Sequence, residues 1–202
     1  MRVFVMLLSL LCAGPAVADV DRLQTTAKAS FARMPDLVMV DRIAGNCGAD
    51  DSVNEAAAYC TTTNQIFVAR ADASTDQTLY LIAHLYGHAV QVQHGVADFA
   101  LDEIRNRPSE ETMLRGLVEL QVDCIAGFLI ARARLSPISL QELFDDDPLA
   151  GPHWGRNPLR IGPARPVDLA LRAEWFDIGQ AGDIAACAPG EFSSALLIAA
   201  LR

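Results

Sequence analysis

Two histidines one helical turn apart are the residues of this chain best suited to chemistry. His84 and His88 stand at positions i and i+4 of an apolar segment that we predict to be helical, so both imidazoles lie on the same face. Two imidazoles at this spacing can each bind a zinc ion through one ring nitrogen. A catalytic tetrahedral zinc site also needs a third protein ligand and an open fourth position for water.

The residue after the first histidine is Leu85. In zinc hydrolases with the His-Glu-x-x-His motif, a glutamate at this position accepts a proton from the zinc-bound water. A leucine side chain has no atom that can do so. General acid–base catalysis typically contributes about 10²–10⁴-fold to a rate. The substitution therefore predicts a metal site with impaired or absent hydrolytic activity.

His94 is one candidate for the third ligand, because it follows His84 by the ten-residue spacing of the metzincin pattern. That pattern needs a glycine where the chain bends between ligands, and this chain has Gln91 there. If the helix continues as far as His94, the imidazole points away from the other two. We therefore expect His94 to lie outside the site.

Glu119 is the other candidate, on a second predicted helix. Asp123 follows it by four residues on the same face, where it could accept a hydrogen bond from a ligand histidine. Apolar neighbours predict that both carboxylates are buried, and a buried carboxylate needs a partner such as a metal–histidine cluster. Glu110 and Glu111, two turns or more upstream, are poorly placed to replace the missing base.

The elements that must position these residues are mostly helical. Caps, breakers and apolar periodicity predict helices at residues 20–32, 77–94, 110–134 and 166–176, a short helix after the Ser139-x-x-Glu142 capping box, and strands at 37–40 and 65–69. Residues 45–54 and 145–161 are rich in turn formers and are predicted to be loops. This balance favours an α+β fold, dominated by helices with a small sheet.

The first eighteen residues are predicted to be a signal peptide. Arg2 precedes an apolar run at residues 3–12, Gly14-Pro15 breaks it, and Ala16-Val17-Ala18 fits a cleavage site. The run is too short to span a bilayer comfortably. We therefore expect an exported protein, periplasmic or secreted, whose residues 19–202 form a single domain.

Net charge and hydropathy exclude some classes of partner. The formal net charge is −9, and an acidic surface argues against nucleic acid or anionic lipid as the main partner. No segment after the leader is apolar for long enough to span a membrane.

Removal of Cys12 with the leader leaves four cysteines, namely Cys47, Cys60, Cys124 and Cys187. An even count in an exported chain favours two disulfides, and the sequence alone allows three pairings. A zinc site of four thiolates is disfavoured, because such sites use Cys-x-x-Cys pairs and none is present.

Several short blocks follow one another in order along the chain. They are Cys47-Gly48, Tyr59-Cys60, residues 82–88 (Ile-Ala-His-Leu-Tyr-Gly-His), residues 119–127 (Glu-Leu-Gln-Val-Asp-Cys-Ile-Ala-Gly), residues 175–179 (Trp-Phe-Asp-Ile-Gly), Gly182-Asp183 and Cys187. Together they resemble the motifs of the bacterial neutral zinc metallopeptidases, in which the third block reads Ile-Ala-His-Glu-x-Gly-His. The resemblance extends over most of the chain after the leader.

This resemblance implies a zincin-like peptidase fold in which His84, His88 and Glu119 bind zinc and Asp123 supports a ligand. It also implies the disulfides Cys47–Cys60 and Cys124–Cys187. Two features depart from the family: Leu85 replaces the catalytic glutamate, and residues 162–166 (Gly-Pro-Ala-Arg-Pro) replace a turn that resembles His-Gly-Ser.

The hypothesis that follows is an exported metallopeptidase homologue that binds zinc, lacks effective catalysis and keeps a cleft for a peptide or protein ligand. One alternative is an active zinc hydrolase with a substitute base. The other is a structural or partner-binding domain without metal. Metal content separates this last alternative from the other two, and turnover separates those two from each other.

Overall fold

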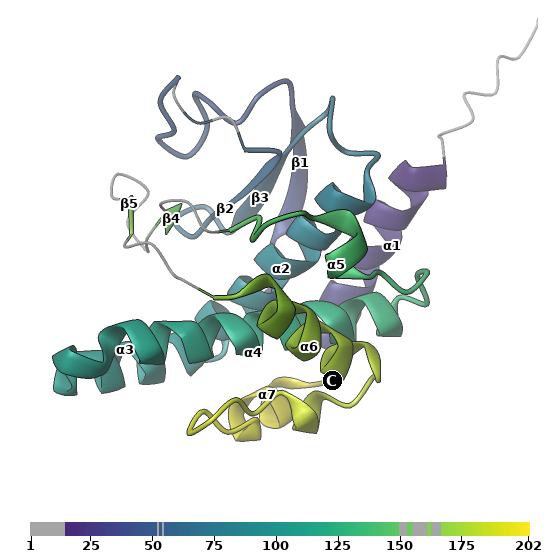
Figure 1. The fold of residues 1–202 in the computed structure, drawn as a ribbon. Coiled ribbons are helices and arrows are strands. Elements are labelled where there is room, and N and C mark those ends of the chain that lie inside the picture. Colours follow the sequence, from purple (N-terminus) through teal and green to yellow (C-terminus); the bar gives the residue numbers. More distant parts are fainter. Residues whose placement is uncertain (1–14, 52, 54, 150–152, 155–160, 163–166) are drawn as a thin grey trace, which may run out of the picture.

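The computed structural model describes residues 15–51, 53, 55–149, 153–154, 161–162 and 167–202. Most of the predicted signal peptide and residues 163–166 of the divergent loop lie outside these ranges. The described chain is dominated by helices and contains a small mixed sheet (Figure 1). This confirms the predicted α+β class.

Three short strands form the main sheet, β1 (Asp36–Val40), β2 (Ala57–Cys60) and β3 (Gln65–Ala69). Their order is β1-β3-β2, with β1 parallel and β2 antiparallel to β3. The sequence predicted β1 and β3 but missed β2, which begins with two alanines that have little preference for strands. Within the predicted loop 145–161, β4 (His153–Trp154) pairs with β5 (Ile161–Gly162).

The helices account for most of the remaining structure. They are α1 (Pro15–Ser30), α2 (Asp76–Gln93), α3 (Val96–Asn106), η1 (Pro108–Glu110), α4 (Glu111–Arg132), α5 (Leu140–Leu143), α6 (Leu169–Gln180), η2 (Ile184–Ala186) and α7 (Ala195–Ala200), where η denotes a 3₁₀ turn. Helix α2 packs against β2, β3, α1 and α4, and α4 packs in turn against α6 (Figure 1). The site described below lies in this stack of helices.

Helix α2 agrees closely with its prediction. Its N-cap is Thr75, whose side chain accepts a hydrogen bond from the Thr78 amide. Its C-cap is His94, and Gly95 follows in the left-handed region with φ of 81°. Helix α3 was not predicted, although residues at every fourth position of this amphipathic segment form one buried apolar face. Those residues, Val96, Ala100 and Ile104, are buried.

Two helices begin later than predicted. The helix predicted from residue 110, with Ser109 as the candidate cap, begins at Glu111 without a side-chain cap, because Pro108–Glu110 forms a 3₁₀ turn, to which proline is well suited by its fixed φ. Helix α6 begins at Leu169, and Asp168 caps it by accepting from the Ala170 amide.

Ser139 precedes the short helix α5 and Glu142 lies within it, so the helix is where the capping box predicted it. The Ser139 side chain makes no cap hydrogen bond, however, and the Glu142 amide donates to the Ser139 carbonyl oxygen instead. Backbone bonding thus closes this turn without the predicted side-chain cap.

Both disulfides follow the pairing implied by the resemblance, with Cys47 bonded to Cys60 and Cys124 to Cys187. The first disulfide lies in a small hydrophobic cluster that includes Ile43 and Phe67. The second ties α4 to the segment after η2, so the helix that carries Glu119 and Asp123 is covalently anchored to the C-terminal region. Among the described helices, none is long and apolar enough to cross a membrane.

Candidate metal centre

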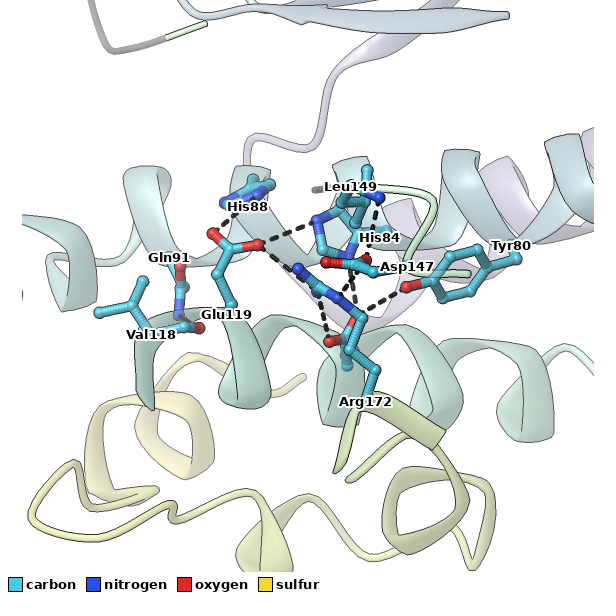
Figure 2. A network of polar contacts seen from close by, with 10 residues as sticks. Tyr80, His84, His88, Gln91, Val118, Glu119, Asp147, Leu149 and Arg172 are labelled. Atoms are coloured by element: carbon cyan, nitrogen blue, oxygen red, sulfur yellow. Dashed lines mark hydrogen bonds and ion pairs between the residues drawn. The ribbon is translucent and has the colours of Figure 1, made fainter. Parts of the chain in front are cut away.

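The structure brings His84, His88 and Glu119 into one cluster between α2 and α4 (Figure 2). The Nε2 atom of His84 lies 3.5 Å from Oε2 of Glu119, and Nε2 of His88 lies 3.6 Å from Oε1. One ligand atom from each of the three residues lies within 4.8 Å of the others. These residues could therefore hold one metal ion in common.

The spacing suits a metal ion better than direct hydrogen bonds. Distances of 3.5 and 3.6 Å between nitrogen and oxygen exceed the usual range for hydrogen bonds. In a tetrahedral zinc site with bonds of about 2.0–2.1 Å, neighbouring ligand atoms lie about 3.3 Å apart. Two imidazole nitrogens and a carboxylate are also a donor set that zinc accepts.

Asp123 determines which nitrogen of His84 is available. Its Oδ1 atom lies 2.8 Å from Nδ1 of His84 and accepts a second hydrogen bond, of 2.9 Å, from the Tyr80 hydroxyl. Burial raises the pKa of Tyr80 well above its usual value, and the charge of Asp123 raises it further, so the phenol stays a donor. With Asp123 as acceptor, the proton of His84 resides on Nδ1 and the lone pair of Nε2 faces Glu119.

Arg172 of α6 is fully buried beside the carboxylates of Glu119 and Asp123. Its guanidinium lies next to Glu119 in Figure 2. Its Nη1 donates to Oδ2 of Asp123 at 2.8 Å and lies 3.7 Å from Oε2 of Glu119. Its Nε donates to Oδ1 of Asp147 at 2.8 Å, and the same oxygen accepts from the Leu149 amide. Burial lowers the pKa of Arg172, but Asp123 and the other neighbouring groups raise it more, so the net shift is upward.

The charges of this cluster favour a divalent cation. Glu119 and Asp123 are fully buried and Asp147 nearly so, and among the described residues Arg172 pairs with Asp123 and Asp147 and lies near Glu119. Buried carboxylates are stabilised by cationic partners. A dication bound between the histidines and Glu119 would add such a partner.

A glycine allows the two ligand-bearing helices to approach each other. A Cβ atom at Gly87 would lie 2.7 Å from the Val122 carbonyl oxygen and 2.9 Å from the Val122 side chain. Gly87 immediately precedes His88, and Val122 immediately precedes Asp123. Close contact between α2 and α4 at this point brings both histidines within reach of Glu119.

The three candidate ligands differ in their exposure. The His88 side chain is 17% exposed, whereas those of His84 and Glu119 are fully buried. Leu85 is partly buried and packs against the main hydrophobic core. It adds apolar surface at the position where the motif of zinc hydrolases has a proton acceptor.

The residues that the sequence analysis placed outside the site do lie elsewhere. His94 is at the end of α2, where its Nε2 is 3.1 Å from the Ala32 carbonyl oxygen. Glu110 pairs with Arg107, and Glu111 pairs with Arg115. Eight residues of α4 separate Glu111 from Glu119, which corresponds to about 12 Å along the helix.

Sequence reasoning missed three residues of the cluster, namely Tyr80, Asp147 and Arg172. A signal existed for two of them. Tyr80 precedes His84 by one helical turn, and Arg172 occupies the face of α6 that otherwise carries the buried Ala173 and Phe176. Asp147 lies in a polar loop, where nothing in the local pattern distinguishes it from its neighbours.

Comparisons with models of protein families, with curated proteins and with solved structures give no match to this chain. The site must therefore be interpreted from its own geometry.

Proposed function

We propose that this protein is an exported zinc-binding homologue of the zincin-like metallopeptidases in which catalysis has been lost. The observation that carries the proposal is the joint position of His84, His88 and Glu119, with their ligand atoms within 4.8 Å of one another. Asp123 adds support, since a carboxylate behind a histidine is the usual partner of a histidine bound to zinc.

The loss of catalysis rests on Leu85. Zinc bound by the triad would supply a Lewis acid and lower the pKa of a bound water. The chain's own groups would hold the ion and orient His84, but the leucine cannot accept a proton from the water. Glu110 and Glu111 were considered as substitutes from the sequence. Both are paired with nearby arginines, and both lie about two helical turns from Glu119.

Export is supported by the leader and by the disulfides. Two disulfides are typical of oxidising compartments such as the periplasm or the extracellular space. A zinc site without turnover suits recognition of a peptide or protein ligand. The partly exposed His88 is the candidate ligand through which such a partner could reach the ion.

Zinc content tests the proposal directly. The purified protein should hold about one zinc ion per chain, measured by elemental analysis after reconstitution and dialysis. His88→Ala should lower the affinity by more than the roughly 10–100-fold that is typical of losing a partner behind a ligand. His94→Ala is the matched control, because it removes a histidine of the same segment outside the cluster and should leave zinc content unchanged. Wild-type protein that stays free of zinc would refute the proposal.

Proteolysis tests the loss of catalysis. Zinc-loaded wild-type protein should show no chelator-sensitive cleavage of casein above the blank, because no proton acceptor occupies position 85. Leu85→Glu would return a carboxylate there, and its activity can be assayed in parallel. Cleavage by the wild-type protein that disappears in His88→Ala would overturn this part of the proposal and demand another base.

A further inference from the structure

Arg172 belongs to the centre without being able to bind a metal. Its guanidinium is fully buried, donates to Asp123 and Asp147, and lies 3.7 Å from Glu119. It comes from α6, which follows the other cluster residues in the chain. A cationic side chain thus lies beside Glu119, the carboxylate that the proposed function assigns to zinc.

Packing alone does not account for this arginine. Its Nη2 atom is buried and makes no hydrogen bond to any described residue. An apolar side chain of similar volume would avoid the cost of desolvating a guanidinium, and such replacements of buried ion pairs are often neutral or stabilising. The feature that an apolar residue could not supply is the positive charge among three carboxylates.

We infer that Arg172 is the internal counter-cation of the metal-free site, which holds Glu119 and Asp123 together in the folded protein before zinc binds. This inference rests on the proposed function. Because Arg172 and zinc both attract Glu119, the arginine stabilises the empty site more than the loaded one. It therefore favours folding without metal and lowers the affinity for zinc.

Asp147 has the opposite effect on affinity. Its carboxylate accepts from Nε of Arg172 at 2.8 Å and so competes with Glu119 for the guanidinium. Without the negative charge of Asp147, the positive charge of Arg172 would act more strongly on Glu119 and oppose zinc. Arg172 and Asp147 form one hydrogen-bonded pair, yet their charges should change zinc affinity in opposite directions.

The test compares Arg172→Gln and Asp147→Asn, both of which break this pair. Zinc affinity is measured by competition with a chromophoric chelator, and melting temperature is measured with and without zinc. Arg172→Gln should tighten zinc binding by about tenfold, and Asp147→Asn should weaken it by a similar factor. Changes of this size are expected when one unit charge close to the metal site is removed. Arg172→Gln should also lower the melting temperature of the metal-free protein more than that of the zinc-loaded protein.

Two further variants make the test specific to charge. Arg172→Lys keeps the charge, so its zinc affinity should stay near that of the wild type and its metal-free stability should exceed that of Arg172→Gln. Arg107→Gln removes an arginine that pairs with Glu103, Glu110 and Glu191 at the surface, and should affect the metal-free and zinc-loaded proteins equally. If metal-free Arg172→Gln does not fold, refolding it with zinc should recover the folded protein.

The outcomes separate this inference from the proposed function. Zinc binding by the wild type, with opposite effects of Arg172→Gln and Asp147→Asn, supports both. Zinc binding by the wild type, with both variants weaker, would show that the pair only positions the ligands and would overturn the counter-cation role alone. Failure of Arg172→Gln to refold even with zinc, together with weakened binding in Arg172→Lys, would overturn it as well. Wild-type protein that binds no zinc would refute both.

Discussion

Replacing Gly127 with alanine is expected to destabilise the protein by about 3 kcal/mol or more, at the upper end of the range for overpacked cores. A Cβ atom at this position in α4 would lie 2.0 Å from the Phe176 carbonyl oxygen of α6. The clash involves backbone, so no side-chain rotation relieves it and the two helices must separate. Because Arg172 lies on α6 and contacts Asp123 on α4, separation would also disturb the metal centre. Urea unfolding of the wild type and of the variant, monitored by circular dichroism, measures the difference in unfolding free energy.

Gly116→Ala is the matched control in the same helix. The nearest atom to a Cβ at Gly116 is a Val167 methyl carbon at 4.0 Å, so the added methyl group has room. Alanine in place of glycine inside a helix should therefore stabilise the protein by roughly 0.5–1 kcal/mol. Opposite signs for the two substitutions are the expected result. A Gly127→Ala variant as stable as Gly116→Ala would show that α4 and α6 are not packed at this distance.

Loss of the Cys124–Cys187 disulfide is expected to cost about 4 kcal/mol of unfolding free energy, and loss of Cys47–Cys60 about 3 kcal/mol, from the chain entropy released in the unfolded state. The difference follows from sequence separations of 63 and 13 residues. The double variants Cys124→Ala/Cys187→Ala and Cys47→Ala/Cys60→Ala, unfolded in urea beside the wild type, measure the two costs. Each double variant serves as the control for the other, because both replace two cysteines with alanine and differ in the length of the loop that is opened.

Peptide mapping without reduction gives an independent check of the pairing. Fragments that join Cys124 to Cys187 and Cys47 to Cys60 are expected. Free thiols or another pairing would remove the physical basis for the predicted stabilities, because the closed loops would then have different lengths. A cost below 1 kcal/mol for the Cys124–Cys187 pair would instead show that the unfolded chain is restricted by other contacts.

Local sequence accounts for those features that depend on neighbouring residues alone. The i, i+4 spacing places His84 and His88 on one face of α2, and this helix begins and ends within one residue of the predicted range 77–94. The β-branched and aromatic residues of Gln65–Ala69 likewise predicted β3. Helical and strand periodicity are short-range properties, so a single sequence contains the information that determines them.

Elements with weak local signals depended on their tertiary environment. Strand β2 (Ala57–Cys60) forms where β3 offers a hydrogen-bonding edge. Ser109 has the residue type of a cap, yet the turn at Pro108–Glu110 moved the start of α4 beyond it. In each case packing outweighed intrinsic preference.

The composition of the candidate site divides in the same way. Sequence spacing and the resemblance suffice to nominate His84, His88, Glu119 and Asp123, because each block carries its own motif. Only the fold could add Arg172 and Asp147, which lie 49 and 24 residues beyond Asp123 in sequence but meet it or its partner at 2.8 Å. Their role depends on burial and on the sum of charges in one volume. Those quantities exist only once α2, α4 and α6 have packed together.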